Sequence, residues 1–223
     1  MKTLACISTL ICFFTLTSYS QDLQSSFDVH QVLYYENENC SNDNFQNKYA
    51  KVYQNLQEPG KFITYSLKSF QDPSITLYLV NQHKVIANPS FPHANFNAAS
   101  GVEIDVKGIK SLNDVQNFPD SKVELKYIKK ENVRKGHRML IAYHFKAKNF
   151  DNIKEIIYYI DHSDSGYPLS FHKSFYEEMR KSNNPLIGNV VQRDEILKNG
   201  ETCSFVLQRV KESRKKFAVN FVE

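Results

Sequence analysis

Apolar and polar residues alternate along most of this chain with a period of two, the pattern of β-strands that bury one face. Segments with this pattern lie at 63–67, 75–79, 84–87, 102–106, 123–127, 139–145, 156–160, 202–210 and 217–222. Turns such as Asp72-Pro73 and Asn81-Gln82-His83 separate neighbouring segments. Because short turns join antiparallel neighbours, the pattern predicts a long antiparallel sheet with one solvent-exposed face and one apolar face.

One stretch near the start has helical spacing instead. Its apolar residues follow each other at intervals of four, three, one and three, and they are Phe45, Tyr49, Val52, Tyr53 and Leu56. Such intervals put side chains on one face of a helix, which Pro59-Gly60 would end. We therefore expect an α+β fold, with an N-terminal amphipathic helix packed on a curved, mostly antiparallel β-sheet that resembles a half-barrel.

The first twenty residues have the pattern of a cleavable signal peptide. A positive start at Lys2 precedes the uncharged run 4–16, and small residues precede a cut before Gln21. That run would rise only ~20 Å as a helix, which is too short for a hydrocarbon layer of ~30 Å. We expect residues 1–20 to be removed, residues 21–41 to be a polar leader, and residues 42–223 to be one domain. The product would be exported, periplasmic or secreted, without a transmembrane segment.

The charge of the expected mature chain is nearly balanced. Removal of Lys2 leaves 27 Lys and Arg against 24 Asp and Glu, or +3. Nucleic-acid binders usually carry a larger and more concentrated basic excess. We do not expect a nucleic-acid partner.

Two cysteines remain after the expected cleavage, Cys40 and Cys203. In an exported chain, two cysteines most simply form one disulfide. We therefore predict a Cys40–Cys203 bond.

The common signatures of catalytic and metal sites are absent from the sequence. We expect no cofactor and no metal. The one enzyme-like cluster is Asp161-His162-Ser163-Asp164. Consecutive residues seldom face each other, so a solvated turn is the better interpretation of this cluster.

Two basic segments stand out against the balanced background. One contains Lys129, Lys130, Arg134, Lys135 and Arg138, and the other lies at 209–216. Either segment could attract an anionic partner, although charged hairpins also keep sheet edges soluble.

The apolar face of the predicted sheet is larger than one helix can cover, and this favours a cavity for an apolar ligand. Alternate residues share a face, so the same period selects the residues that would line it. The candidates are Ile63, Tyr65, Leu67, Ile75, Leu77, Leu79, Leu125, Tyr127, Ile141 and Tyr143.

Several pieces of the sequence resemble exported bacterial envelope proteins. These are Lys84-Val85-Ile86-Ala87-Asn88-Pro89, Phe91-Pro92, Asn95-Phe96-Asn97, Ile157-Tyr158-Tyr159-Ile160-Asp161 and Gly166-Tyr167-Pro168-Leu169. Over residues 42–175 they resemble the LolA-like lipoprotein carriers and their uncharacterised relatives. The resemblance implies a half-barrel whose concave apolar face shelters acyl chains. It transfers no functional residue.

Three functions follow from these observations. The first is a non-enzymatic exported carrier for a lipid or another apolar ligand. The second is an interaction or inhibitor module on a cystatin-like scaffold, acting through residues 88–100 or 129–138. The third is an envelope enzyme that uses Asp161, His162 and Asp164.

Overall fold

The computed structural model describes residues 25–38, 49–57, 61–67, 73–79, 84–88, 102–107, 124–149, 152–170, 172–214 and 216–222. The predicted signal peptide, Cys40 and the segment 89–100 lie outside these residues. Within the described part of the chain, strands dominate. They are β1 (Ser25–Asp28), β2 (Gln31–Glu38), β3 (Tyr49–Gln54), β4 (Lys61–Leu67), β5 (Pro73–Leu79), β6 (Lys84–Asn88), β7 (Val102–Lys107), β8 (Glu124–Lys135), β9 (Arg138–Lys148), β10 (Ile153–Asp161), β11 (Asn189–Leu197), β12 (Thr202–Glu212) and β13 (Lys216–Val222).

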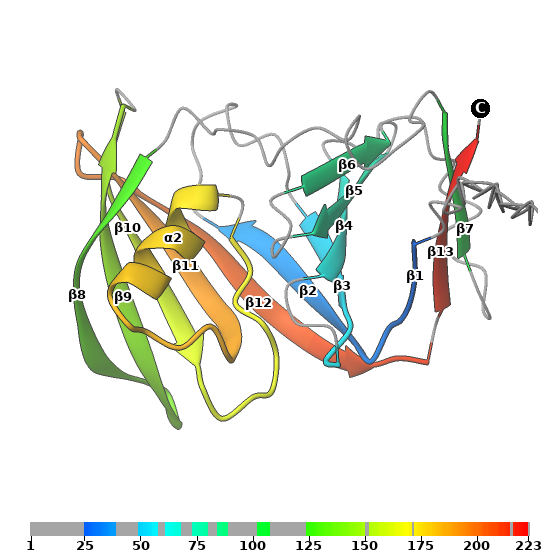
Figure 1. The fold of residues 1–223 in the computed structure, drawn as a ribbon. Helices are drawn as coiled ribbons and strands as arrows, with labels where there is room; N and C mark the ends of the chain where they lie inside the picture. Colours follow the sequence, from blue (N-terminus) through cyan, green and yellow to red (C-terminus); the bar gives the residue numbers. More distant parts are fainter. Residues whose placement is uncertain are drawn as a thin grey trace, which may run out of the picture.

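Ten of these strands form one antiparallel sheet in the order β6-β5-β4-β3-β2-β12-β11-β10-β9-β8. The order consists of two meanders, β2 to β6 and β8 to β12, which meet where β2 pairs with β12 (Figure 1). A smaller sheet has the order β1-β13-β7, and its β13–β7 pair is parallel. The predicted antiparallel sheet is therefore confirmed.

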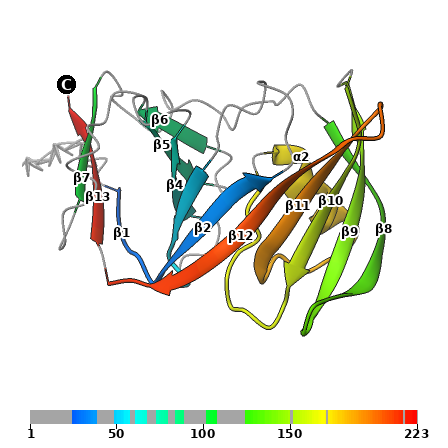
Figure 2. The same cartoon turned by 180° about the vertical axis from the view of Figure 1, so that it is seen from behind.

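The β2–β12 pair continues from the large sheet into the small one. Gln31 lies opposite Glu212 at the end of the first ladder, and Asp28 lies opposite Lys216 at the start of the next. Between these two ladders the Ser213 N–H donates to the His30 carbonyl at 2.9 Å. This bond holds the two segments together where they pass from one sheet to the other. Figure 2 shows β1 and β13 leaving the large sheet side by side at this point.

The segment 21–41, predicted as a polar leader, contains β1 and β2. β2 lies between β3 and β12 in the large sheet. Its apolar residues Val32, Leu33 and Tyr35 are buried, because the strand has neighbours on both sides.

The predicted N-terminal helix is wrong, and so is the α+β class that depended on it. Residues 49–54 form strand β3 instead. Val52 is completely buried, and it lies opposite Leu33 of β2 and Thr64 of β4. Tyr and Val favour strands, and the neighbours on both sides supply hydrogen bonds that override a short helical pattern.

Within the described residues the helix of this fold lies near the C-terminal end, at α2 (Lys173–Lys181). It covers one face of the sheet in front of β9, β10 and β11 (Figure 1). Phe175, Tyr176 and Met179 of α2 are buried, at intervals that place them on one side of the helix. The helix ends at Ser182, whose N–H bonds the Glu178 carbonyl, and Asn183 follows in the left-handed region with φ 52°.

Aromatic rings join the helix to the sheet. Phe175 lies 4.4 Å from Tyr158 and 5.3 Å from Phe145 between ring centroids. These residues belong to one apolar core that extends along the sheet to Leu33 and Val52. None of the helices in the described residues has the length and apolarity needed to cross a membrane.

We expect Phe175→Ala to lower the free energy of unfolding by about 3–5 kcal/mol, because a fully buried ring leaves a cavity between α2 and the sheet. Met139→Ala is the control, since Met139 is 64% exposed and should change stability by less than about 0.5 kcal/mol. Urea denaturation of both variants measures the difference. Similar small losses would contradict the packing of α2 on the sheet.

Candidate functional site

The edge of the large sheet carries a concentration of positive charge. Residues 124–148 form the antiparallel pair β8–β9, joined by a two-residue turn in which Gly136 has φ 60°. This segment, here named the basic hairpin, contains eight Lys and Arg against Glu124 and Glu131. The basic residues are Lys126, Lys129, Lys130, Arg134, Lys135, Arg138, Lys146 and Lys148. The basic segment predicted at 129–138 is thus the outer half of this hairpin.

Two lysines of the basic hairpin face each other directly. Lys126 of β8 lies opposite Lys146 of β9, and both side chains are exposed. Like charges opposite each other destabilise a sheet. Neither lysine has an ion-pair partner among the described residues, and the same holds for Arg134 and Lys148. The fold therefore tolerates repulsion here and leaves these charges available to solvent or to a partner.

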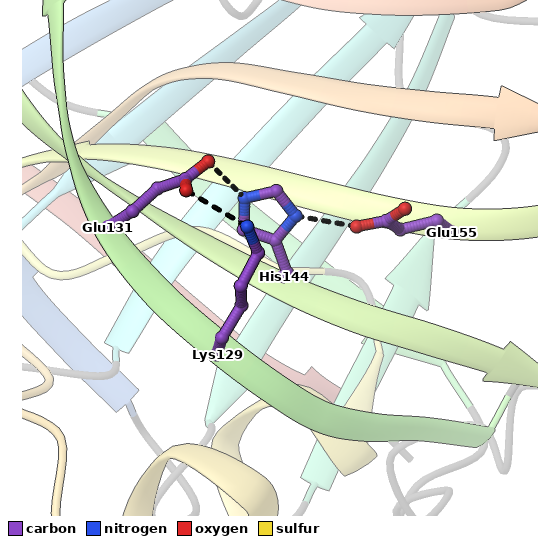
Figure 3. A network of polar contacts seen from close by, with 4 residues as sticks. All are labelled: Lys129, Glu131, His144 and Glu155. Atoms are coloured by element: carbon purple, nitrogen blue, oxygen red, sulfur yellow. Dashed lines mark hydrogen bonds and ion pairs between the residues drawn. The ribbon is translucent and has the colours of Figure 1, made fainter.

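A polar network lies on the face of the hairpin opposite α2 (Figure 3). His144 is buried between two carboxylates, with Nδ1 2.5 Å from Oε1 of Glu155 and Nε2 3.0 Å from Oε1 of Glu131. Lys129 donates to the other Glu131 oxygen at 2.9 Å. Hydrogen bonds from Lys129 and His144 lower the pKa of Glu131. The network joins β8, β9 and β10 through side chains.

The tip of the hairpin is anchored on the same face. Lys135 donates to Oε1 of Gln192 at 2.7 Å, and its ammonium lies 3.4 Å from the ring centroid of Tyr159. Gln192 and Ser204 both donate to Oδ1 of Asp194. Burial raises the pKa of Tyr159 to about 12, and Asp194 adds to this shift. Lys135 is thereby part of the scaffold, unlike Lys126 and Lys146.

The cluster Asp161-His162-Ser163-Asp164 forms a turn after β10. Oδ1 of Asp161 accepts hydrogen bonds from the backbone N–H and the hydroxyl of Ser163, as in an Asx-turn. His162 Nε2 instead lies 2.9 Å from the Tyr143 hydroxyl, and Asp164 accepts from Asn189. Burial lowers the pKa of His162. The groups of this cluster thus contact different parts of the scaffold. The described residues contain no group of acidic, His and Cys side chains suited to a metal ion.

A buried ion pair lies in β11, on the face that α2 covers. Arg193 Nη2 is 3.0 Å from Oε1 of Glu195, and the guanidinium stacks on Phe205 at 5.1 Å. Burial raises the pKa of Glu195, and the attraction of Arg193 only partly opposes this. Buried pairs of this kind seldom add stability over apolar residues, so they suggest a structural or functional constraint. The sequence pattern alone does not indicate this pair.

His172, at the start of α2, lies close to that ion pair. Withdrawal of its ring from water lowers its pKa to about 3, and the positive charge of Arg193 contributes to the shift. The ring is therefore neutral at every ordinary pH. Its backbone N–H donates to the Ser170 hydroxyl, which also bonds Tyr158.

The residues predicted to line a ligand cavity fall into two groups. Leu125 and Tyr143 are buried in the core under α2, and Tyr127 and Ile141 pack against it. The other six belong to β4 and β5, whose side chains lie outside the described part. In the ladder Ile63 lies opposite Tyr53, whereas Thr64 lies opposite the core residue Val52.

For the group in β4 and β5 the structure gives the strand register alone. The members of this group are Ile63, Tyr65, Leu67, Ile75, Leu77 and Leu79. The structure thus brings Leu125, Tyr127, Ile141 and Tyr143 to one core, and it does not describe the side chains of the other six. Their role in binding stays a prediction.

A scan of the chain against protein-family models finds no match, and a search of curated proteins finds none either. The resemblance to LolA-like carriers remains a prediction from sequence.

We expect the stability of the protein to fall as the pH decreases from about 6.5 toward 3, in part because of His172. In this window the unfolded chain binds a proton at His172 that the folded chain does not. His172→Asn removes this proton and keeps a residue that can begin a helix. Urea denaturation at several pH values should show a flatter dependence for the variant. Parallel curves for the two proteins would contradict the lowered pKa.

Proposed function

We propose that this chain is an exported, non-enzymatic interaction protein that binds an acidic protein partner through the basic hairpin. The observation that carries the proposal is the pair Lys126–Lys146, two exposed lysines held opposite each other without an ion-pair partner in the described residues. Like charges directly opposite each other destabilise a sheet, although Glu155 of β10 lies on the other side of Lys146. Positive charge is retained here despite its repulsion.

The surroundings of the lysines support this proposal. Glu155 lies opposite Lys146 on β10, and both Glu155 and Glu131 are already engaged by His144. The network therefore limits how far these carboxylates can turn to neutralise the hairpin. A positive surface on a nearly neutral protein steers an acidic partner toward one orientation and raises the association rate. Such steering weakens with salt, since the Debye length is about 8 Å at physiological ionic strength.

The arrangement of the turn at 161–164 favours a non-enzymatic role. His162 contacts Tyr143 and Asp161 contacts Ser163, so the imidazole and the carboxylate do not act on each other as base and orienting group. A role of Asp161, His162 and Asp164 in holding the scaffold is enough to explain their contacts.

We expect the triple variant Lys126→Glu/Arg134→Glu/Lys146→Glu to lose at least about tenfold in affinity for poly-L-glutamate, used here as the acidic probe. None of these three side chains forms an ion pair within the described residues, so their replacement breaks no ion pair there. The matched control is Lys154→Glu/Lys198→Glu/Lys211→Glu, which makes the same change of net charge at exposed positions outside the hairpin. Binding is measured by fluorescence titration at two salt concentrations.

The control variant should keep its affinity within about threefold. If both variants weaken equally, binding depends on net charge alone and the hairpin has no special role. If neither weakens, the proposal fails.

A second candidate function is a carrier for a lipid or another apolar ligand, and one observation favours it. The register aligns apolar positions across β4, β5 and β6, with Ile63 opposite Leu77 and Leu77 opposite Ile86. Apolar positions aligned across three neighbouring strands could form a surface that such a ligand contacts.

For this second candidate we expect the wild type to take up an apolar fluorescent probe and Leu77→Ala to take up less. The variant should lose less than the ~2–5 kcal/mol of unfolding free energy that a filled core would lose, because the side chain would face a ligand space. Ile141→Ala is the comparison, since Ile141 packs against the core under α2. A wild type that takes up no probe, together with a large loss of stability in Leu77→Ala, would exclude the carrier.

A further inference from the structure

β8 is an edge strand. Its two halves differ in the hydrogen-bond partners of the backbone N–H groups that point away from β9. Within the described residues it pairs only with β9. In its first half, α2 covers the outer side, because Ser174 Oγ accepts from the Leu125 N–H at 2.9 Å and Glu178 Oε2 accepts from the Tyr127 N–H at 3.2 Å. These two contacts show that Leu125 and Tyr127 direct their N–H groups away from β9.

A β-bulge then changes which residues point outward. The register shifts by one between Tyr127 and Lys129, leaving Ile128 as the extra residue. Outward and inward positions alternate along an antiparallel strand, so after the bulge Lys130, Asn132 and Arg134 carry the outward groups. The N–H groups of these three residues have no hydrogen-bond partner among the described residues. Among the described residues, the second half of β8 is therefore an open edge.

We propose that this open edge takes up an extended acidic segment of the partner as an additional β-strand. The inference rests on the proposed function, and it adds the mode of binding and the chemistry of the bound segment. Exposed backbone groups supply the hydrogen bonds of strand addition, and side chains at alternate positions supply the selectivity.

Charge complementarity identifies the occupant. Lys130 and Arg134 lie on one face of the open edge, four residues apart, with uncharged Asn132 between them. Lys130 already donates to Oδ1 of Asn184 at 3.1 Å, and an ammonium has two further protons to donate. A strand with acidic residues at positions i and i+4 would place one carboxylate beside each cation. A second copy of β8 would instead bring these cations close to one another, which disfavours self-association at this edge.

A proline substitution distinguishes the contribution of backbone hydrogen bonds to binding from the contribution of charge. Asn132→Pro removes one outward N–H and leaves the net charge unchanged, and proline is tolerated in an edge strand when its nitrogen faces away from the ladder. Asn132→Thr is the matched control, because it keeps the N–H and favours a strand. The probe is a capped, fluorescently labelled peptide of sequence Thr-Glu-Val-Thr-Val-Glu-Thr, which carries its two acids four residues apart. Binding to the full chain is measured by fluorescence anisotropy.

We expect Asn132→Pro to weaken binding of the peptide by at least about tenfold and Asn132→Thr to change it by less than about threefold. Hydrogen exchange of the wild type supplies a second measurement that does not depend on the folding of a variant. The peptide should slow hydrogen exchange at the amides of Lys130, Asn132 and Arg134. The exchange rate of the Tyr127 amide should change little, because this N–H already donates to Glu178.

The outcomes distinguish this inference from the proposed function. If charge reversal abolishes binding but Asn132→Pro binds normally and the three amides gain no protection, the hairpin binds through its side chains and strand addition is excluded. If the wild type binds neither poly-L-glutamate nor the peptide, both proposals fail.

Discussion

The pairing of β2 with β12 is the contact on which the rest of the structure depends. It joins two meanders, each made of strands that follow one another in sequence, into one sheet of ten strands. Its register includes Tyr35 opposite Leu207 and Val32 opposite Lys211, pairs separated by more than 170 residues. Closing so long a loop costs conformational entropy before the contacts of the ladder can form, so this ladder should form late in folding. The stacked rings of Tyr35 and Phe205, 4.6 Å apart, stabilise it from the core side.

One consequence of this junction is that polar groups become buried near the centre of the sheet. β11 has neighbours on both sides, and Arg193 and Glu195 point to the face that carries the core. Each would be expensive to bury alone, and together they form an ion pair that Phe205 shields. His172 lies next to them, and its pKa is lowered first by withdrawal of the ring from water and then by the positive charge of Arg193.

The sequence predicted most strands correctly, because alternation is visible wherever one face is buried. The helix predicted at 45–56 was wrong, because Val52 fits both the helical and the strand period. Pairing with the neighbouring strands decides between the two structures, and five residues of sequence do not reveal those neighbours. β11 was not predicted, since its central residues Gln192 to Glu195 are polar although three of them are buried. The basic segment was visible as composition, but the contact of its Glu131 with His144 depends on strand register. Register is fixed by pairing across the sheet and not by local pattern.

The open half of β8 shows how the same features can serve solubility and binding. Lysines on an edge strand discourage pairing with another edge, which alone would explain Lys129 and Lys130. That explanation does not account for the difference between the two halves of β8. α2 supplies Ser174 and Glu178 to close the first half, whereas within the described residues no such contact closes the second half, beyond the bulge at Ile128. Protection against self-pairing by positive charge would leave such an edge open to a strand of the opposite charge, so in the proposed mode of binding the charges that prevent aggregation also select the partner.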